Sequence, residues 1–176
     1  RTLRLHLLRT FVVNEDLDTL AAAFGVVCRK RAMHLVTAES CTGGLIAATV
    51  TDIAGSSAWF DRGFVVYTPE AKMQMLGVQP ETLNRCGVVS EPVAREMAVG
   101  ALAHSKATIA VAVTGVAGPS GGTEKTPVGT VCFGFAVKTP QGVCAESSEQ
   151  HFAGNRAQVR QETVRFALKT LIALCS

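Results

Sequence analysis

The sequence predicts a single α/β domain with three layers, in which helices cover both faces of a mixed β-sheet. Segments with helical patterning alternate with short apolar segments, as expected for a sheet that lies between helices. Residues 107–115, ATIAVAVTG, form an uninterrupted apolar run, which is typical of a strand buried on both faces. Two alternating runs flank a Pro-Gln-Gly turn within residues 129–152 and predict an antiparallel hairpin.

The first part of the chain contains two helix–strand pairs. Residues 14–32 predict a helix capped by Asn14, with acidic side chains in its first turn and basic side chains in its last, which suits the helix dipole. The apolar residues 34–38 predict a buried strand, and a helix is expected over about residues 42–55. Residues 59–68 contain Phe, Val and Tyr, which favour a strand.

The elements that follow include helices with proline in the first turn, a position that tolerates proline because its N–H would be unpaired anyway. Ser90 is the expected cap of the third of these helices. The final segment, residues 155–176, has the apolar spacing of an amphipathic helix. The three helices that contain proline are predicted at residues 69–77, 80–87 and 90–106.

The composition excludes several classes of protein. Of the 176 residues, 48% are hydrophobic and 18% are charged, which is incompatible with a disordered chain. No apolar run approaches the roughly 18 residues that a membrane span requires. The net charge of +3 comes from residues 1–31, and the remaining residues carry equal numbers of basic and acidic side chains. We therefore predict that neither nucleic acid nor a membrane is a partner.

The cysteines are scattered among apolar neighbours and show neither a CxxC pair nor the Cys/His spacing of a metal site. Thiols in such surroundings are usually reduced and part of the core. The pattern predicts a cytoplasmic protein without disulfides, metal or other cofactor. The six residues are Cys28, Cys41, Cys86, Cys132, Cys144 and Cys175.

Two regions are expected in the chain. Residues 1–13 are basic and apolar, lack a small-residue cleavage site, and are predicted to be an N-terminal extension without a chemical role. Residues 14–176 form the predicted domain. Its longest stretch without predicted structure is the glycine-rich loop of residues 115–128, and a loop of this length is more often functional than idle.

Three stretches contain candidate functional residues. TAESCTGG (37–44) and AVTGVAGPSGG (112–122) each place glycines directly after an apolar strand, where ligands bind in open α/β sheets. VVYTPEAK (65–72) contains the single tyrosine, Tyr67, and Lys72 at another strand-to-helix junction. Neither glycine-rich stretch matches GxxxxGK[ST] or GxGxxG, which excludes a Walker or Rossmann site.

The first stretch offers two possible nucleophiles, Ser40 and Cys41. A serine needs a base, and none of the four histidines lies in a glycine-rich turn. A lysine made neutral by partial burial can serve instead, and Lys72 is the best placed candidate. The alternative is that Lys72 is an ordinary solvated helix residue, and His151 would then be the next base to consider.

The same stretches carry a resemblance to a known family. TAESCTGGLIAATVTDIAGSSAWFDRGFVVYTPEAKMQMLGV, GVVSEPVAREMAVGAL and AVTGVAGPSGGTEKTPVGTV occur in the order found in the C-terminal domain family of the competence/damage-inducible protein CinA. The resemblance covers about residues 14–173. Stand-alone members are amidohydrolases that convert nicotinamide mononucleotide to nicotinic acid mononucleotide and ammonia, in pyridine nucleotide recycling. Together with the apolar extension, the resemblance also predicts a homo-oligomer.

The resemblance implies roles for individual residues. The family's serine falls on Ser40, its lysine on Lys72 and its tyrosine on Tyr67, which we expect to form the catalytic group. Backbone N–H groups near Ser40 are expected to hold the oxyanion, the second glycine-rich stretch to approach the nucleotide, and Arg156 to meet its phosphate. The expected substrate-binding residues are Glu39, Thr42, Gly43, Gly44, Thr114, Gly115, Ala117, Gly118, Gly121, Gly122 and Arg156.

The sequence departs from the family pattern at a few positions. Asn155 stands where the family has an acid, Thr126 displaces Lys125 by one position, and Cys132 replaces an aromatic residue. These departures leave open a second hypothesis, a catalytically silent nucleotide-binding or regulatory module of the same fold. Cys41 remains the rival nucleophile, although as the neighbour of Ser40 it is expected to point away from the site.

Overall fold

The computed structural model describes residues 16–176, so the predicted extension 1–13 and the predicted cap Asn14 lie outside the described residues. Within that range the helices and strands alternate much as the sequence predicts. The elements are α1 (Leu17–Arg31), β1 (Leu35–Glu39), α2 (Leu45–Thr51), the 3-10 turn η1 (Ser56–Ala58), β2 (Phe60–Val65), α3 (Pro69–Leu76), α4 (Pro80–Cys86), α5 (Glu91–Ala103), β3 (Ile109–Gly115), β4 (Thr130–Thr139), β5 (Gly142–His151) and α6 (Arg156–Cys175).

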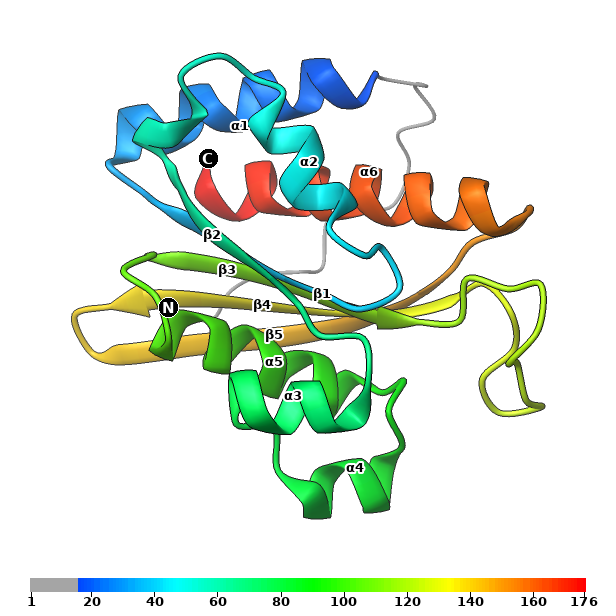
Figure 1. The fold of residues 1–176 in the computed structure, drawn as a ribbon. Coiled ribbons are helices and arrows are strands. Elements are labelled where there is room, and N and C mark those ends of the chain that lie inside the picture. Colours follow the sequence, from blue (N-terminus) through cyan, green and yellow to red (C-terminus); the bar gives the residue numbers. More distant parts are fainter. Residues whose placement is uncertain (1–15) are drawn as a thin grey trace.

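The five strands form one mixed sheet in the order β2-β1-β3-β4-β5. Strands β2, β1 and β3 are parallel, whereas β4 pairs antiparallel with both β3 and β5. Helices α1, α2 and α6 cover one face of the sheet, and α3, α4 and α5 lie on the other (Figure 1). The predicted three-layer α/β architecture and the predicted hairpin are therefore confirmed.

Each face of the sheet has its own hydrophobic core. Along β3, the isoleucine and valine side chains join the cluster beneath α1 and α6, whereas Ala110 and Ala112 join the cluster beneath α5. The small side chains let α5 approach the strands closely. A Cβ at Gly134 of β4 would collide with the carbonyl oxygen of Ala94 on α5, so the packing requires glycine there.

Two helix starts and one side-chain cap differ from the prediction. The cap of α1 is Asp16, two residues after Asn14, and α2 begins at Leu45 rather than near residue 42. The delay in α2 arises because Gly43 and Gly44 adopt left-handed backbone conformations, with φ of 59° and 99°. Ser90 does precede α5 as expected, but its hydroxyl donates to the carbonyl of Gly87 instead of capping the helix.

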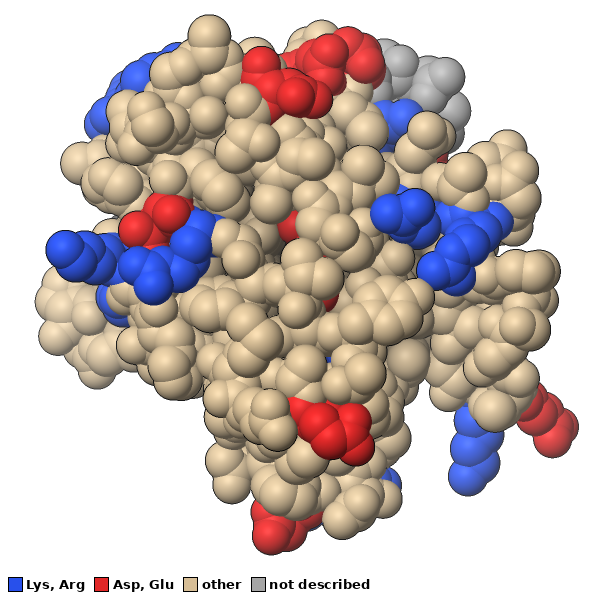
Figure 2. All heavy atoms as spheres, viewed as in Figure 1, with Lys and Arg blue, Asp and Glu red and all other residues tan. Residues whose placement is uncertain are grey.

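The surface charge agrees with the composition. In the view of Figure 2, Lys and Arg side chains form small separate groups, one of which surrounds an acidic side chain, and this face of the molecule carries no continuous basic surface. None of the helices in residues 16–176 combines the length and the apolar character needed to cross a membrane.

Candidate active site

The three candidate stretches meet at one edge of the sheet. Ser40 directly follows β1, Thr114 and Gly115 end β3, and Tyr67 lies shortly after β2. Because these strands are parallel neighbours, their carboxyl ends lie side by side. Lys72, on α3, enters this edge from the helix that follows β2.

Ser40 and Lys72 are in direct contact. The Nζ atom of Lys72 lies 2.9 Å from the Oγ atom of Ser40, 2.9 Å from the carbonyl oxygen of Val66 and 3.4 Å from that of Tyr67. A neutral amine has two N–H donors and one lone pair. The two carbonyls can take both donors, which leaves the lone pair for the hydroxyl proton of Ser40.

The surroundings of Lys72 favour this neutral form. Its side chain is fully buried, and burial lowers the pKa of Lys72 from 10.5 to about 8. Among the described residues, no carboxylate forms an ion pair with its amine. The alternative that Lys72 is a solvated helix residue is therefore wrong. The sequence signal was ambiguous because α3 as a whole is only weakly amphipathic.

Cys41 is buried in the hydrophobic core beside Ile46 and Val50, as expected of a residue that points away from the site. Burial raises the pKa of the Cys41 thiol to about 12. A thiol in this state is not a nucleophile near neutral pH. The geometry thus favours Ser40 of the two candidates.

Residues 40–44 form the turn that carries Ser40, which we call the nucleophile turn. The N–H of Ser40 donates to the carbonyl of Val113 on β3 at 3.0 Å, and the N–H of Gly43 donates to the carbonyl of Ser40 at 3.0 Å. These two bonds hold the turn against the central strand and close it on itself.

Glu39 and Thr42 have different roles from those expected. The Glu39 side chain is fully buried, and its carboxylate accepts hydrogen bonds from the Thr42 hydroxyl at 2.7 Å and from the N–H groups of Gly44, Ile46 and Ala47 at 3.1, 2.9 and 2.8 Å. Both side chains therefore face the interior rather than the substrate. A contact of Thr42 with the substrate would therefore come from its backbone N–H group, and the Glu39 carboxylate is already occupied within the protein.

The N–H groups available to an oxyanion also differ from those expected. Gly43 and Gly44 already donate their N–H groups within the protein, so they are not available to an oxyanion. The N–H groups of Cys41 and Thr42 donate to no other residue among residues 16–176, although the N–H of Cys41 also interacts with its own thiol. These two groups are the donors left beside Ser40.

Arg160 is a member of the site that the sequence did not indicate. From α6 its Nη2 atom donates to the carbonyl of Thr42 at 2.9 Å, and a Cβ at Gly43 would lie 3.8 Å from the same nitrogen. The contact joins segments 118 residues apart in the chain. No local pattern could have found it, because only the packing of α6 beside α2 creates it.

Arg156 contacts two other predicted residues. At the start of α6, its Nη1 atom donates to the carbonyl of Gly118 at 2.8 Å and its Nη2 atom to the hydroxyl of Tyr67 at 3.0 Å. The Tyr67 side chain is 57% exposed. A cation, a phenol and a glycine-rich backbone thus converge on the surface next to Ser40 and Lys72.

The second glycine-rich stretch divides into a buried and an exposed part. Thr114 is buried and donates to the carbonyl of Val88, Ala117 is buried, and a Cβ at Gly115 would lie 2.8 Å from the carbonyl oxygen of Thr130. These residues hold the end of β3 in place. Because the side chains of Thr114 and Ala117 are buried, the structure does not indicate that they contact the substrate directly. Gly121 and Gly122 are exposed.

The departures from the family pattern have structural explanations. Asn155 caps α6: its side chain accepts from the N–H of Gln158 at 3.0 Å, and the Gln158 side chain accepts from the N–H of Asn155 at 2.8 Å. The N–H of Thr126 donates to the hydroxyl of Thr123 and closes the tip of the loop. Lys125 and His151 are exposed.

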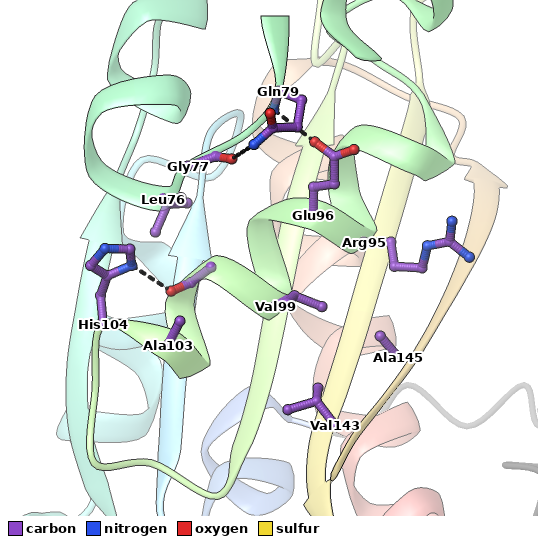
Figure 3. Close-up of a pocket in the computed structure, with 11 residues that line it drawn as sticks. Leu76, Gly77, Gln79, Arg95, Glu96, Val99, Ala103, His104, Val143 and Ala145 are labelled. Atoms are coloured by element: carbon purple, nitrogen blue, oxygen red, sulfur yellow. Dashed lines mark hydrogen bonds between the residues drawn. The ribbon is translucent and has the colours of Figure 1, made fainter. Parts of the chain in front are cut away.

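A groove of about 590 Å³ lies elsewhere, between α3, α5 and the β4–β5 hairpin. Its walls include Val99 and Val143, with Arg95, Glu96 and His104 around them (Figure 3). None of the predicted site residues lines it. Within residues 16–176, no group of three or more His, Cys, Asp or Glu side chains gathers in a way that can hold a metal ion.

The fold and the site define a mixed-sheet α/β protein with a buried serine–lysine pair at the carboxyl edge of its parallel strands. The CinA C-terminal domain model matches residues 17–175, and the chain belongs to this family.

Similar proteins include the "Nicotinamide-nucleotide amidohydrolase PncC" of Escherichia coli K12, which is 49% identical over 160 residues, 91% of this chain and 95% of that protein. A "Putative competence-damage inducible protein" of Symbiobacterium thermophilum is 50% identical over 165 residues, 90% of this chain but 38% of that longer protein. The crystal structure of competence/damage inducible protein CihA from Agrobacterium tumefaciens is 46% identical, with a TM-score of 0.84 over 95% of this chain and all of that one.

Proposed function

We propose that this chain hydrolyses the carboxamide of nicotinamide mononucleotide to nicotinic acid mononucleotide and ammonia. The observation that carries the proposal is the 2.9 Å contact between the Oγ atom of Ser40 and the buried amine of Lys72. A serine beside a base of lowered pKa is a nucleophile suited to acyl transfer. The substrate is suggested by the amidohydrolase name of the Escherichia coli relative, which matches this chain over nearly all of its length.

The first half of the proposed reaction forms an acyl-enzyme. Ser40 attacks the carbonyl carbon of the carboxamide while its proton moves to the Lys72 amine. The tetrahedral intermediate then collapses, the C–N bond breaks, and the Lys72 ammonium gives its proton to the departing nitrogen, which leaves as ammonia. The nicotinoyl group remains as an ester on Ser40.

The second half restores the enzyme. Water attacks the ester carbonyl while Lys72 takes a proton from it, the ester bond to Ser40 breaks, and that proton returns to the Ser40 oxygen. Nicotinic acid mononucleotide is released. In both halves the negative charge on the carbonyl oxygen needs donors, and the N–H groups of Cys41 and Thr42 are the proposed pair.

Recognition of the nucleotide is assigned to the exposed part of the site. The Arg156 guanidinium supplies positive charge for the phosphate, and the glycines of residues 118–122 allow its close approach to the backbone. We assign Tyr67, whose hydroxyl accepts from Arg156, to this exposed part rather than to the catalytic group in which it was predicted, and propose that it contacts the pyridine or the ribose. Catalysis by Ser40 and Lys72 requires no metal or other cofactor in this scheme.

We also propose a cellular location and an oligomeric state for the enzyme. All six cysteines are free thiols in the structure, which supports a reducing, cytoplasmic location. We retain the homo-oligomer as a prediction that light scattering on the purified chain will measure. No nucleic acid is expected as a partner.

Ammonia release tests the proposal and its main alternative together. Purified protein is incubated with nicotinamide mononucleotide with and without EDTA, and ammonia is measured over time. Equal turnover in both samples is expected. Loss of turnover only with EDTA would refute the metal-free scheme, whereas binding of the mononucleotide without turnover in either sample would favour the catalytically silent module.

A further inference from the structure

Glu39 is an unusual carboxylate for the interior of a protein. It is fully buried, and no cation among residues 16–176 forms an ion pair with it. Burying a charge is costly unless its hydrogen-bonding capacity is met. Here the capacity is met by four donors from the turn and the helix that immediately follow it.

Glu39 takes the place of a local cap for α2. The position before the helix is Gly44, whose φ of 99° does not suit the Ser, Asn or Asp that commonly caps a helix, and glycine has no side chain to do so. The chain instead uses a carboxylate that reaches back from the end of β1. Its bonds also extend to Thr42 within the nucleophile turn, so they constrain the turn as well as the helix.

The hydrogen bonds that Glu39 accepts help to determine which N–H donors remain available near Ser40. Glu39 takes the N–H of Gly44, and the closed turn uses that of Gly43. Arg160, on α6, donates to the Thr42 carbonyl. The peptide groups around Thr42 are thus fixed by one anion and one cation, and within the nucleophile turn the N–H groups of Cys41 and Thr42 are those that donate to no other described residue.

We infer that Glu39 is a positioning residue for Ser40: its buried carboxylate sets the shape of the nucleophile turn and so keeps Ser40 against Lys72, with two available N–H donors beside it. This role rests on the proposed function of Ser40 as nucleophile. It differs from mere stabilisation of α2, because it predicts a loss of turnover in protein that remains folded.

The chain contains a matched control. The carboxylate of Glu96, on α5, accepts from the N–H of Gln79 at 2.8 Å and from the hydroxyl of Thr82 at 2.6 Å, at the start of α4 (Figure 3). It therefore ties down the start of a helix in the same way as Glu39. It lines the groove rather than the candidate active site.

The test compares Glu39→Gln with Glu96→Gln in the full chain. Glutamine keeps the side-chain size but replaces one acceptor oxygen with an NH2 group, so at least one donor around Glu39 loses its acceptor. We expect kcat of Glu39→Gln to fall on the order of 100-fold with KM changed by less than about threefold. Glu96→Gln should keep kcat within about twofold, even where both variants lower the thermal midpoint. Equal effects of the two substitutions on kcat would overturn the inference.

A milder variant keeps the test decisive if Glu39→Gln does not fold. Thr42→Val removes one donor from the carboxylate at nearly constant shape. It should lower kcat by about tenfold without raising KM. Wild-type kcat in Thr42→Val would overturn the inference.

A second reaction separates this inference from the choice of substrate. Release of p-nitrophenol from p-nitrophenyl acetate, after subtraction of the Ser40→Ala rate, reports the reactivity of Ser40 without a nucleotide. The ratio of wild type to Glu39→Gln should match that for the mononucleotide. If only the ester reacts, the proposed substrate fails and the ester ratio decides the role of Glu39. If neither reaction depends on Ser40, both proposals fail.

Discussion

The nucleophile turn and the glycine-rich loop of residues 115–128 both follow parallel strands, yet they are held very differently. The turn is tied to β3 through Ser40, to β1 through Glu39 and to α6 through Arg160. The loop is exposed at residues 119–125, and its tip is closed only by bonds between Thr123 and Thr126. Arg156 of α6 anchors the start of the loop through its bond to the Gly118 carbonyl.

Under the proposed function, this difference separates the part of the site that does the chemistry from the part that recognises the nucleotide. A nucleophile must be held within a fraction of an ångström of its reacting geometry, which a turn bonded from three elements provides. A loop with few anchors can adjust to the shape of a nucleotide. Changes in the nucleophile turn and at Lys72 should therefore act on kcat, and changes beside the loop should act on KM.

The largest effect is expected at Ser40. Ser40→Ala removes the nucleophile and should reduce ammonia release to below about one ten-thousandth of the wild-type rate. Cys41→Ala should keep most of the activity, because the Cys41 thiol is buried and its pKa is raised to about 12. Steady-state assays of both variants decide the nucleophile. A cysteine variant that loses activity while the serine variant retains it would assign the reaction to Cys41.

Lys72→Arg should lower kcat/KM on the order of 1,000-fold, since arginine keeps the charge but does not release a proton in this pH range. In the wild type, kcat/KM should rise with pH through a midpoint near the Lys72 pKa of about 8, because the neutral amine is the active form. The variant should lack this rise. A variant within about tenfold of wild type would exclude Lys72 as the base and turn attention to His151.

The same pKa predicts how stability depends on pH. Burial lowers the pKa of Lys72 from 10.5 to about 8. Below pH 8 the amine is therefore protonated in both the folded and the unfolded chain, and the folded state bears the full free-energy cost of burying the ammonium. Between pH 8 and 10.5 the unfolded chain binds more protons, and the folded state gains stability as pH rises.

Chemical denaturation at several pH values measures this gain. The free energy of unfolding of the wild type, minus that of Lys72→Met, should increase by on the order of 3 kcal/mol from pH 7 to pH 11. The subtraction removes groups that titrate equally in both proteins. A difference that stays constant with pH would show that Lys72 is not a buried amine of lowered pKa.

The smallest effect is expected at the loop. Arg156→Ala removes the contacts to Gly118 and Tyr67 and should raise KM for the mononucleotide about tenfold with little change in kcat. Arg95→Ala, an exposed arginine beside the groove, is the matched control and should leave both constants unchanged. A fall in kcat of Arg156→Ala with constant KM would place Arg156 with the chemistry instead.

Much of this architecture was predictable from local patterns. The alternation of apolar strands and amphipathic helices, the uninterrupted run that became β3, and the turn of the hairpin all depend on short-range periodicity. The family motifs pointed to Ser40 and Lys72, and the structure brings these two residues into contact. Where patterns failed, as at the start of α2, the cause was a backbone conformation of Gly43 and Gly44 that periodicity does not report.

By itself, then, the sequence determined the order of the elements, the class of fold and the residues able to do the chemistry, because each of these depends on side-chain type and near neighbours. Only the tertiary structure decided the state of Lys72, since its burial comes from packing between α3 and the sheet edge. It likewise decided that Glu39 faces inward and that Arg160 reaches the turn from α6. Burial and contacts between distant segments are properties of the packed chain, so no local pattern encodes them.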